Sequence, residues 1–145
     1  MSEERGHGLP GSAGAPPFEG VLETVLYFTD AARTEEFYAG VLGMRLLAKD
    51  EEGRNLFFRA GGSVFLMFDA SATERGGTLP PHGARGEMHT CFRVPEEYYE
   101  AWKDHLRARG VEILQEVTWP RGVSFYFRDP DGNLLEIANA DIWPA

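Results

Sequence analysis

The sequence lacks the cysteine pairs that stabilise small extracellular proteins and the long apolar segments that anchor proteins in membranes. A single cysteine among 145 residues allows no disulfide within the chain, which is typical of reducing compartments and indicates the cytoplasm. No apolar run approaches the roughly 18 residues needed to cross a bilayer, and the first residues lack the basic and then apolar pattern of a signal peptide. The length still predicts one domain with a core of its own.

Positive charge is also scarce. The chain has 14 Lys and Arg against 23 Asp and Glu, a formal net charge of -9. Such a surface repels phosphate backbones and anionic lipids, so nucleic acids and membranes are disfavoured as partners. A small molecule is the expected ligand.

Glycine and proline divide the chain into a tail, a domain and an internal linker. Residues 1–17 are rich in Gly, Ser, Pro and Glu and lack apolar periodicity, which predicts a flexible tail before a domain at 18–145. Residues 70–87 are also rich in glycine and include two prolines. A connection of this length inside a compact domain is usually functional or links two modules.

The segment before the linker predicts a strand, a helix and three more strands. Asp30 is placed to cap the helix, and Gly43 stands where a left-handed residue would end it. Apolar residues between them recur at helical spacing. The strands are expected at 22–28, 44–49, 55–60 and 63–68.

The segment after the linker repeats this order. A helix is expected from Pro95 to Gly110, with an apolar stripe of Tyr98, Trp102 and Leu106. Strands are expected at 88–94, 111–117, 123–128 and 133–138. Equivalent residues lie 66 to 70 positions apart: Glu23 and His89, Gly43 and Gly110, Gly62 and Gly132, Leu66 and Glu136. The spacing indicates an internal repeat with modules at about 20–69 and 88–140.

Three segments carry a resemblance to a known family. They are VLYFTDAARTEEFYAGVLG at 25–43, MHTCFRV at 88–94 and RDPDGNLLEI at 128–137. Together and in this order they resemble the vicinal oxygen chelate superfamily of glyoxalases, bleomycin-resistance proteins, fosfomycin-resistance proteins and extradiol dioxygenases. The resemblance implies an α+β fold in which two βαβββ modules pair into a cupped, incomplete β-barrel. It also implies metal ligands on the first and last strands of the modules.

Side-chain alternation decides which residues face this cup. In the last hairpin, one face is apolar, with Phe125, Phe127, Leu135 and Ile137. Tyr126 and Glu136 then lie opposite each other on the other face. The same reasoning turns Glu23, His89 and Cys91 towards the concave side.

The resemblance makes Glu23, His89 and Glu136 the candidate metal ligands. Leu66, the counterpart of Glu136, has no donor atom, and glutamate stands at 23 where family members commonly have histidine. Two carboxylates and an imidazole would neutralise a divalent cation such as Zn, Mn, Fe or Ni and leave positions open. Alternatively, His89 is a hydrogen-bonded core residue, and Glu23 is a general base or pairs with Arg93.

Further candidates line the expected cup. Tyr27, Tyr126 and Cys91 are nominees for catalysis, although a lone inward cysteine is commonly a small buried hydrophobe. Nominees for substrate binding are Leu66, Phe58, Phe68, Arg93 and Trp119. Ordinary β-sheet packing is the alternative for the aromatic residues.

Two functions remain open. The first is a metal-dependent enzyme whose divalent cation chelates two adjacent oxygens of a small molecule, as a lyase, isomerase, transferase or dioxygenase. The second is metal-free sequestration of a small molecule, as in bleomycin-resistance proteins. In either case, edge strands of the open sheets would allow a homodimer.

Overall fold

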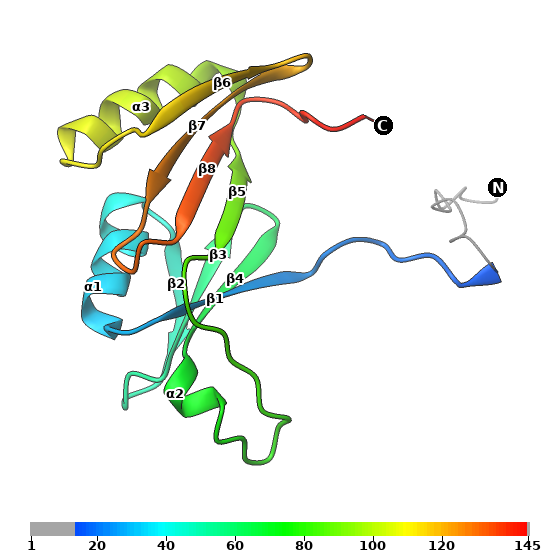
Figure 1. The fold of residues 1–145 in the computed structure, drawn as a ribbon, viewed down its shortest axis with the longest axis vertical. Coiled ribbons are helices and arrows are strands. Elements are labelled where there is room, and N and C mark those ends of the chain that lie inside the picture. Colours follow the sequence, from blue (N-terminus) through cyan, green and yellow to red (C-terminus); the bar gives the residue numbers. More distant parts are fainter. Residues whose placement is uncertain (1–13, 145) are drawn as a thin grey trace, which may run out of the picture.

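The computed structural model describes residues 14–144 as an α+β fold built on two four-stranded sheets. Each sheet has a helical segment on one face (Figure 1). Most of the expected tail, residues 1–13, lies outside the described residues. Within the described part, no helix is long and apolar enough to span a membrane.

The first module has the expected strand–helix–strand–strand–strand order. Its strands lie in the order β1-β4-β3-β2, with β1 parallel to β4. The elements are β1 (Glu23–Phe28), α1 (Ala31–Glu35), the π-helix η2 (Glu36–Val41), β2 (Arg45–Lys49), β3 (Asn55–Ala60) and β4 (Ser63–Asp69).

The second module repeats this topology, with its strands in the order β5-β8-β7-β6 and β5 parallel to β8. Its elements are β5 (His89–Arg93), the 3-10 turn η3 (Glu96–Tyr98), α3 (Tyr99–Ala108), β6 (Gln115–Trp119), β7 (Gly122–Arg128) and β8 (Leu134–Ala138). The short helix α2 (Ala70–Thr73) begins the segment between the modules.

The first helical segment begins and ends where the sequence predicts. The Asp30 carboxylate accepts a hydrogen bond from the Arg33 amide at 3.0 Å, which caps α1. Gly43 has φ +70°, a conformation that only glycine adopts at little cost. The helical spacing does not reveal that the second half, η2, winds as a π-helix.

The second helix keeps part of the expected stripe, because Leu106 is buried and Trp102 packs against the core, but Tyr99 takes the place of Tyr98. The buried residues of the helix are Tyr99, Lys103 and Leu106, whereas Tyr98 is 56% exposed. The 3-10 turn before Tyr99 has a different angular step from an α-helix, which leaves Tyr98 off the face that meets the sheet. Lys103 is tolerated there because its Nζ donates to Glu116 at 2.6 Å. The strand expected at 111–117 likewise lies further along, at Gln115–Trp119.

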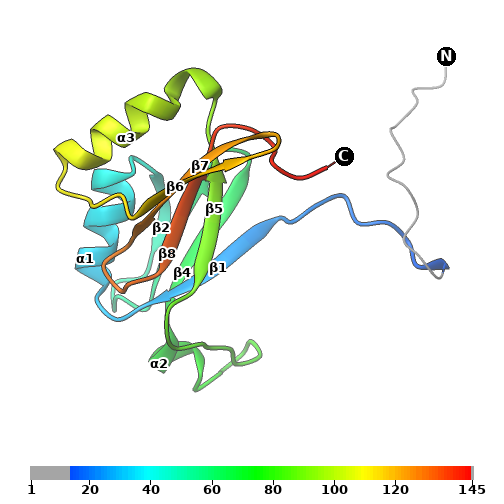
Figure 2. The same ribbon diagram turned by 45° about the horizontal axis from the view of Figure 1, so that its top comes forward.

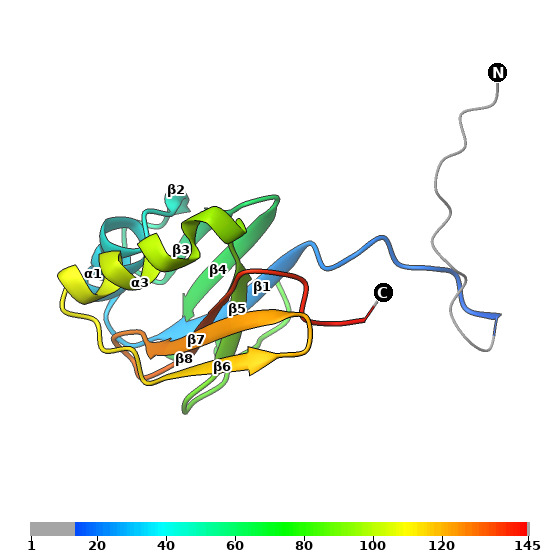
Figure 3. The ribbon, with the colours of Figure 1, turned by 90° about the horizontal axis from the view of Figure 1, so that it is seen from above.

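The two modules share one hydrophobic core. Among the described residues, no strand of one sheet pairs with a strand of the other. Instead, α1 and α3 lie on the same side of the molecule (Figures 2 and 3), and aromatic side chains join the modules. Phe37 contacts Phe127 with ring centroids 6.4 Å apart, and Phe65 contacts Phe92 at 5.5 Å.

A buried polar cluster at the DPDGN turn reinforces this junction. Asp129 is only 6% exposed. Its carboxylate accepts hydrogen bonds from the Tyr38 hydroxyl at 2.7 Å, the Asn133 side-chain amide at 2.9 Å, and the Asn133 and Asp131 backbone amides at 2.9 Å each. Because Tyr38 belongs to the first module, the Asp129 carboxylate both stabilises its own turn and links that turn to the first module.

Candidate metal and substrate site

Strand register brings the polar residues of the second module together. Cys91 and Tyr126 are both Cα partners of Glu136, on either side of it in the sheet, so the three side chains share a face. Phe125 and Leu135 are fully buried in the core on the opposite face. The expected pairing of Tyr126 with Glu136 is therefore confirmed.

His89 and Glu136 form the centre of the site. The His89 Nε2 lies 3.3 Å from the Glu136 Oε1. The His89 Nδ1 lies 2.7 Å from the Leu134 carbonyl oxygen; because a carbonyl can only accept, Nδ1 carries the hydrogen. In the neutral imidazole, the Nε2 lone pair then faces a carboxylate oxygen.

The Glu136 carboxylate is left short of partners. Its side chain is 6% exposed, and its Oε2 has no hydrogen-bond partner among the described residues. Burying such an oxygen is costly unless something positive meets it. An imidazole nitrogen and a carboxylate that face each other with free lone pairs fit a divalent cation.

A pocket of about 720 Å³ opens in front of this pair. Its walls come only from the second module and the segment that follows it. They comprise His89, Thr90, Cys91, Arg93, Trp119, Tyr126, Glu136, Ala138, Ala140, Asp141, Ile142 and Trp143. The pocket therefore holds two of the three expected metal ligands and the expected Arg93 and Trp119.

The two reactive side chains beside Glu136 stay protonated. Burial, followed by the negative charge of Glu136, raises the pKa of the Cys91 thiol to about 12. The same two causes raise the pKa of Tyr126. Because the thiolate is the nucleophilic form of cysteine, Cys91 at neutral pH is a poor nucleophile. Both groups are better suited to donating hydrogen bonds than to abstracting protons.

The remaining predicted residues belong to the first sheet. Register places Val25 beside Leu66 and Tyr27 beside Phe68, on the same face of β1 and β4 as Glu23. Phe58 instead is fully buried in the shared core, so the expectation that it faces the ligand is corrected. Leu56 is buried in the same core.

Glu23 does not join the other two candidate ligands within one chain. No three His, Cys, Asp or Glu side chains of residues 14–144 are grouped so that they could hold a metal ion. Glu23 is an exposed residue at the start of edge strand β1, and it is absent from the walls of the pocket that contains His89.

The sequence did not predict that His82, in the linker, would contact the first sheet. Its Nδ1 lies 2.6 Å from the Tyr27 hydroxyl, and its ring meets Phe68 edge-on with centroids 4.9 Å apart. Burial, followed by the charge of Glu74, raises the pKa of Tyr27. No periodicity in the glycine-rich linker could have predicted these contacts.

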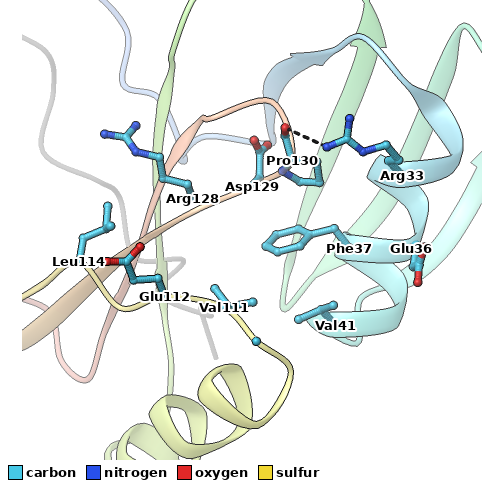
Figure 4. Close-up of a pocket in the computed structure, with 11 residues that line it drawn as sticks. Arg33, Glu36, Phe37, Val41, Val111, Glu112, Leu114, Arg128, Asp129 and Pro130 are labelled. Carbon is cyan, nitrogen blue, oxygen red and sulfur yellow. Dashed lines mark hydrogen bonds between the residues drawn. The ribbon is translucent and has the colours of Figure 1, made fainter.

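A second pocket, of about 580 Å³, lies where the two modules meet and contains none of the predicted site residues (Figure 4). Arg33 donates to the Pro130 carbonyl across it at 3.5 Å. Its buried carboxylate, Asp129, already accepts four hydrogen bonds from protein groups. This pocket is a feature of the module junction, and its one buried carboxylate is already satisfied by protein groups.

Comparison with known proteins agrees with this geometry. A family model described as the Glyoxalase/Bleomycin resistance protein/Dioxygenase superfamily matches residues 20–137. The chain belongs to this superfamily. The match includes both modules and all three candidate metal ligands.

Individual members of the superfamily resemble the chain over most of its length. Glutathione transferase FosA of Serratia marcescens is 31% identical over 112 residues, which cover 77% of this chain and 74% of that protein. A crystal structure of lactoylglutathione lyase from Agrobacterium tumefaciens is 31% identical, with a TM-score of 0.82, and covers 89% of this chain and 99% of that one.

A third relative shares the fold and contains a metal. It is a fosfomycin resistance protein, FosX, of Listeria monocytogenes, in complex with Mn(II) and a dihydroxypropylphosphonic acid. It is 21% identical, with a TM-score of 0.65, and covers 86% of this chain and 93% of that one. Divalent metals thus occur in this superfamily.

Proposed function

We propose that this member of the superfamily is a divalent-metal-dependent enzyme whose small-molecule substrate presents two adjacent oxygens. The observation that carries the proposal is the buried Glu136 carboxylate, whose Oε2 lacks a partner while its Oε1 faces the His89 Nε2 at 3.3 Å. A structural carboxylate at such a depth would be expected to have all its hydrogen bonds.

His89 and Glu136 would hold the metal, which when bound supplies Lewis acidity to the chelated oxygens. The Leu134 carbonyl holds the His89 ring in the tautomer that turns Nε2 to the metal. Tyr126 stacks on the same ring at 6.1 Å between centroids and keeps its hydroxyl hydrogen. It can therefore orient a substrate oxygen by donating to it.

The relatives favour chemistry on a thiol-linked substrate over ring cleavage. Both proteins that are 31% identical have names that refer to glutathione, one a transferase and the other a lyase. We therefore place the reacting sulfur on the substrate side.

The third ligand, Glu23, is proposed to come from a second copy of the chain. The pocket is formed by the second module and the C-terminal segment alone, and β1 and β5 are both edge strands of their sheets. A symmetric pair of chains could set the β1 of one copy beside the β5 of the other. Each pocket would then gain an exposed carboxylate from its partner.

Metal analysis tests the function. We expect the full-length protein, stripped with EDTA and reloaded with Mn²⁺ or Zn²⁺, to retain about one metal per chain after desalting. His89→Ala and Glu136→Gln should each weaken metal binding by at least about 100-fold, since loss of even an outer-shell partner costs about 10–100-fold.

His105→Ala is the matched control, because the His105 Nε2 contacts only the Val41 carbonyl, at 2.7 Å. This variant should bind metal as the parent does. Parent protein that takes up none of Mn²⁺, Zn²⁺, Fe²⁺ or Ni²⁺ would instead point to metal-free binding of a small molecule.

Mixing two variants tests whether the site is shared. Glu23→Ala and His89→Ala chains, each with its own affinity tag, would be co-expressed and the mixed pair isolated through both tags. In a shared arrangement, pairs of Glu23→Ala chains alone and of His89→Ala chains alone should both lose metal. One of the two sites of the mixed pair, by contrast, has all its ligands and should restore about half of the parent's metal. A mixed pair without metal, or chains that never pair, would show that Glu23 does not act in the partner's site.

A further inference from the structure

Arg93 is the cation of the pocket that contains His89 and Glu136, and it lacks a partner. Among the described residues, no carboxylate lies within ion-pairing distance of its guanidinium, and the side chain makes no hydrogen bond. By contrast, Arg54, Arg85 and Arg128 are each paired with an acidic side chain. Arg93 is an exposed residue, so its guanidinium is free to meet a charged group of a ligand in the pocket.

Strand geometry gives the position of Arg93 relative to the proposed metal. His89, Cys91 and Arg93 alternate along β5 onto one face. At about 3.3 Å per residue, the Cα atoms of His89 and Arg93 are about 13 Å apart. The Cα partner of Arg93 is Ala138, whose side chain is small, and Glu136 lies level with Cys91, midway between Arg93 and His89 along the sheet.

Much of the rest of the pocket wall is apolar and aromatic. Trp119, Tyr126, Ile142 and Trp143 line the pocket with Ala138 and Ala140. The indole nitrogen of Trp119 is already used, since it donates to the Ser124 hydroxyl at 2.8 Å. The ring can therefore meet a ligand through its faces, as in other pockets with a few placed polar groups on an apolar wall.

We propose that the pocket selects an elongated monoanion: a carboxylate at Arg93, an apolar or aromatic middle along the tryptophans, and chelating oxygens at the His89–Glu136 end. The chelating end rests on the proposed function; the carboxylate end does not. Arginine binds a carboxylate through two parallel hydrogen bonds.

A carboxylate suits this pocket better than a phosphonate. Arg93 is the only basic side chain among the pocket's lining residues apart from His89, and Asp141 adds a negative charge to the same wall. A second negative charge on the ligand would meet no second cation and would be repelled by Asp141. A single charge at this end is therefore the better match.

Binding of matched ligands tests the inference. The probes are 3-phenylpropionate, its neutral amide 3-phenylpropanamide and the dianion 2-phenylethylphosphonate, titrated calorimetrically into the full-length protein as purified and after EDTA treatment. We expect the carboxylate to bind at least about 10-fold more tightly than the amide in both preparations, and the phosphonate to bind less tightly than the carboxylate. Added salt should reduce the preference for the carboxylate over the amide.

Arg93→Gln should abolish that preference while leaving binding of the amide unchanged, and Arg93→Lys should keep part of it. The Arg93→Gln protein should still take up metal as the parent does, which separates this inference from the metal proposal. Equal affinities for the carboxylate and the amide, a preference that survives in Arg93→Gln, or no binding of the carboxylate up to about 10 mM would each overturn the inference.

Discussion

Replacing Asp129 by alanine is expected to lower the free energy of unfolding by about 3–5 kcal/mol, because it leaves buried donors without their charged acceptor. Four donors converge on this carboxylate, three from its own turn and one from Tyr38. Asn133, which donates twice, has no solvent exposure and cannot turn to water instead. Urea denaturation followed by circular dichroism measures the change.

Tyr38→Phe separates the two roles of this carboxylate. It removes only the hydrogen bond that Tyr38 donates to Asp129 and keeps the ring that packs against Phe58 and Phe65. A loss of about 1–2 kcal/mol is expected from one hydrogen bond to a charged acceptor. An Asp129→Ala protein within about 1 kcal/mol of its parent would show that the turn does not depend on this side chain.

The elements that sequence could predict are those governed by local chemistry. Asp30 caps α1 and Gly43 follows the helical segment with a positive φ because capping and handedness depend on a residue and its near neighbours. Strand alternation likewise predicts that Tyr126 lies opposite Glu136, since one face of that hairpin is apolar.

Where both faces of an element are apolar, alternation cannot decide which one is buried. β3 has Phe57 on one face and Phe58 on the other, so nothing local identifies Phe58 as the core residue. The start of α3 is similarly missed, because a 3-10 turn precedes Tyr99 and leaves Tyr98 exposed, while Trp102 and Leu106 meet the core as expected.

The site residues likewise fall into those whose positions follow from local pairing and those whose positions depend on long-range packing. His89 and Glu136 lie on strands that pair with each other, so their proximity follows from topology and alternation. The placement of Glu23 depends on how separate sheets, or separate chains, come together, and that is a matter of long-range packing. The contact of His82 with Tyr27 depends on the path of the linker, which has no periodicity.

Replacing the Glu136 carboxylate by a side chain of similar length is expected to stabilise the protein once metal is removed. Glu136→Met fills the same buried position without an oxygen that lacks a partner. We expect a gain of about 1–3 kcal/mol in the free energy of unfolding after EDTA treatment.

Metal should offset this difference in stability or reverse it. A metal present at 100 times its dissociation constant adds about 2.7 kcal/mol to a protein that binds it only when folded. The parent should gain this amount, and Glu136→Met should gain nothing. Unfolding in urea with and without Mn²⁺ measures both effects on the same preparations.

Glu116→Met is the matched control, because Lys103 and Tyr99 both donate to the Glu116 carboxylate, at 2.6 and 3.0 Å. Its loss should destabilise the protein whether or not metal is present, since it leaves the buried Lys103 with only Glu100 to pair with. If Glu136→Met destabilised the metal-free protein as Glu116→Met does, Glu136 would be a structural residue like Glu116. The opposite sign of the two effects would identify Glu136 as a carboxylate whose burial is compensated only by a bound cation.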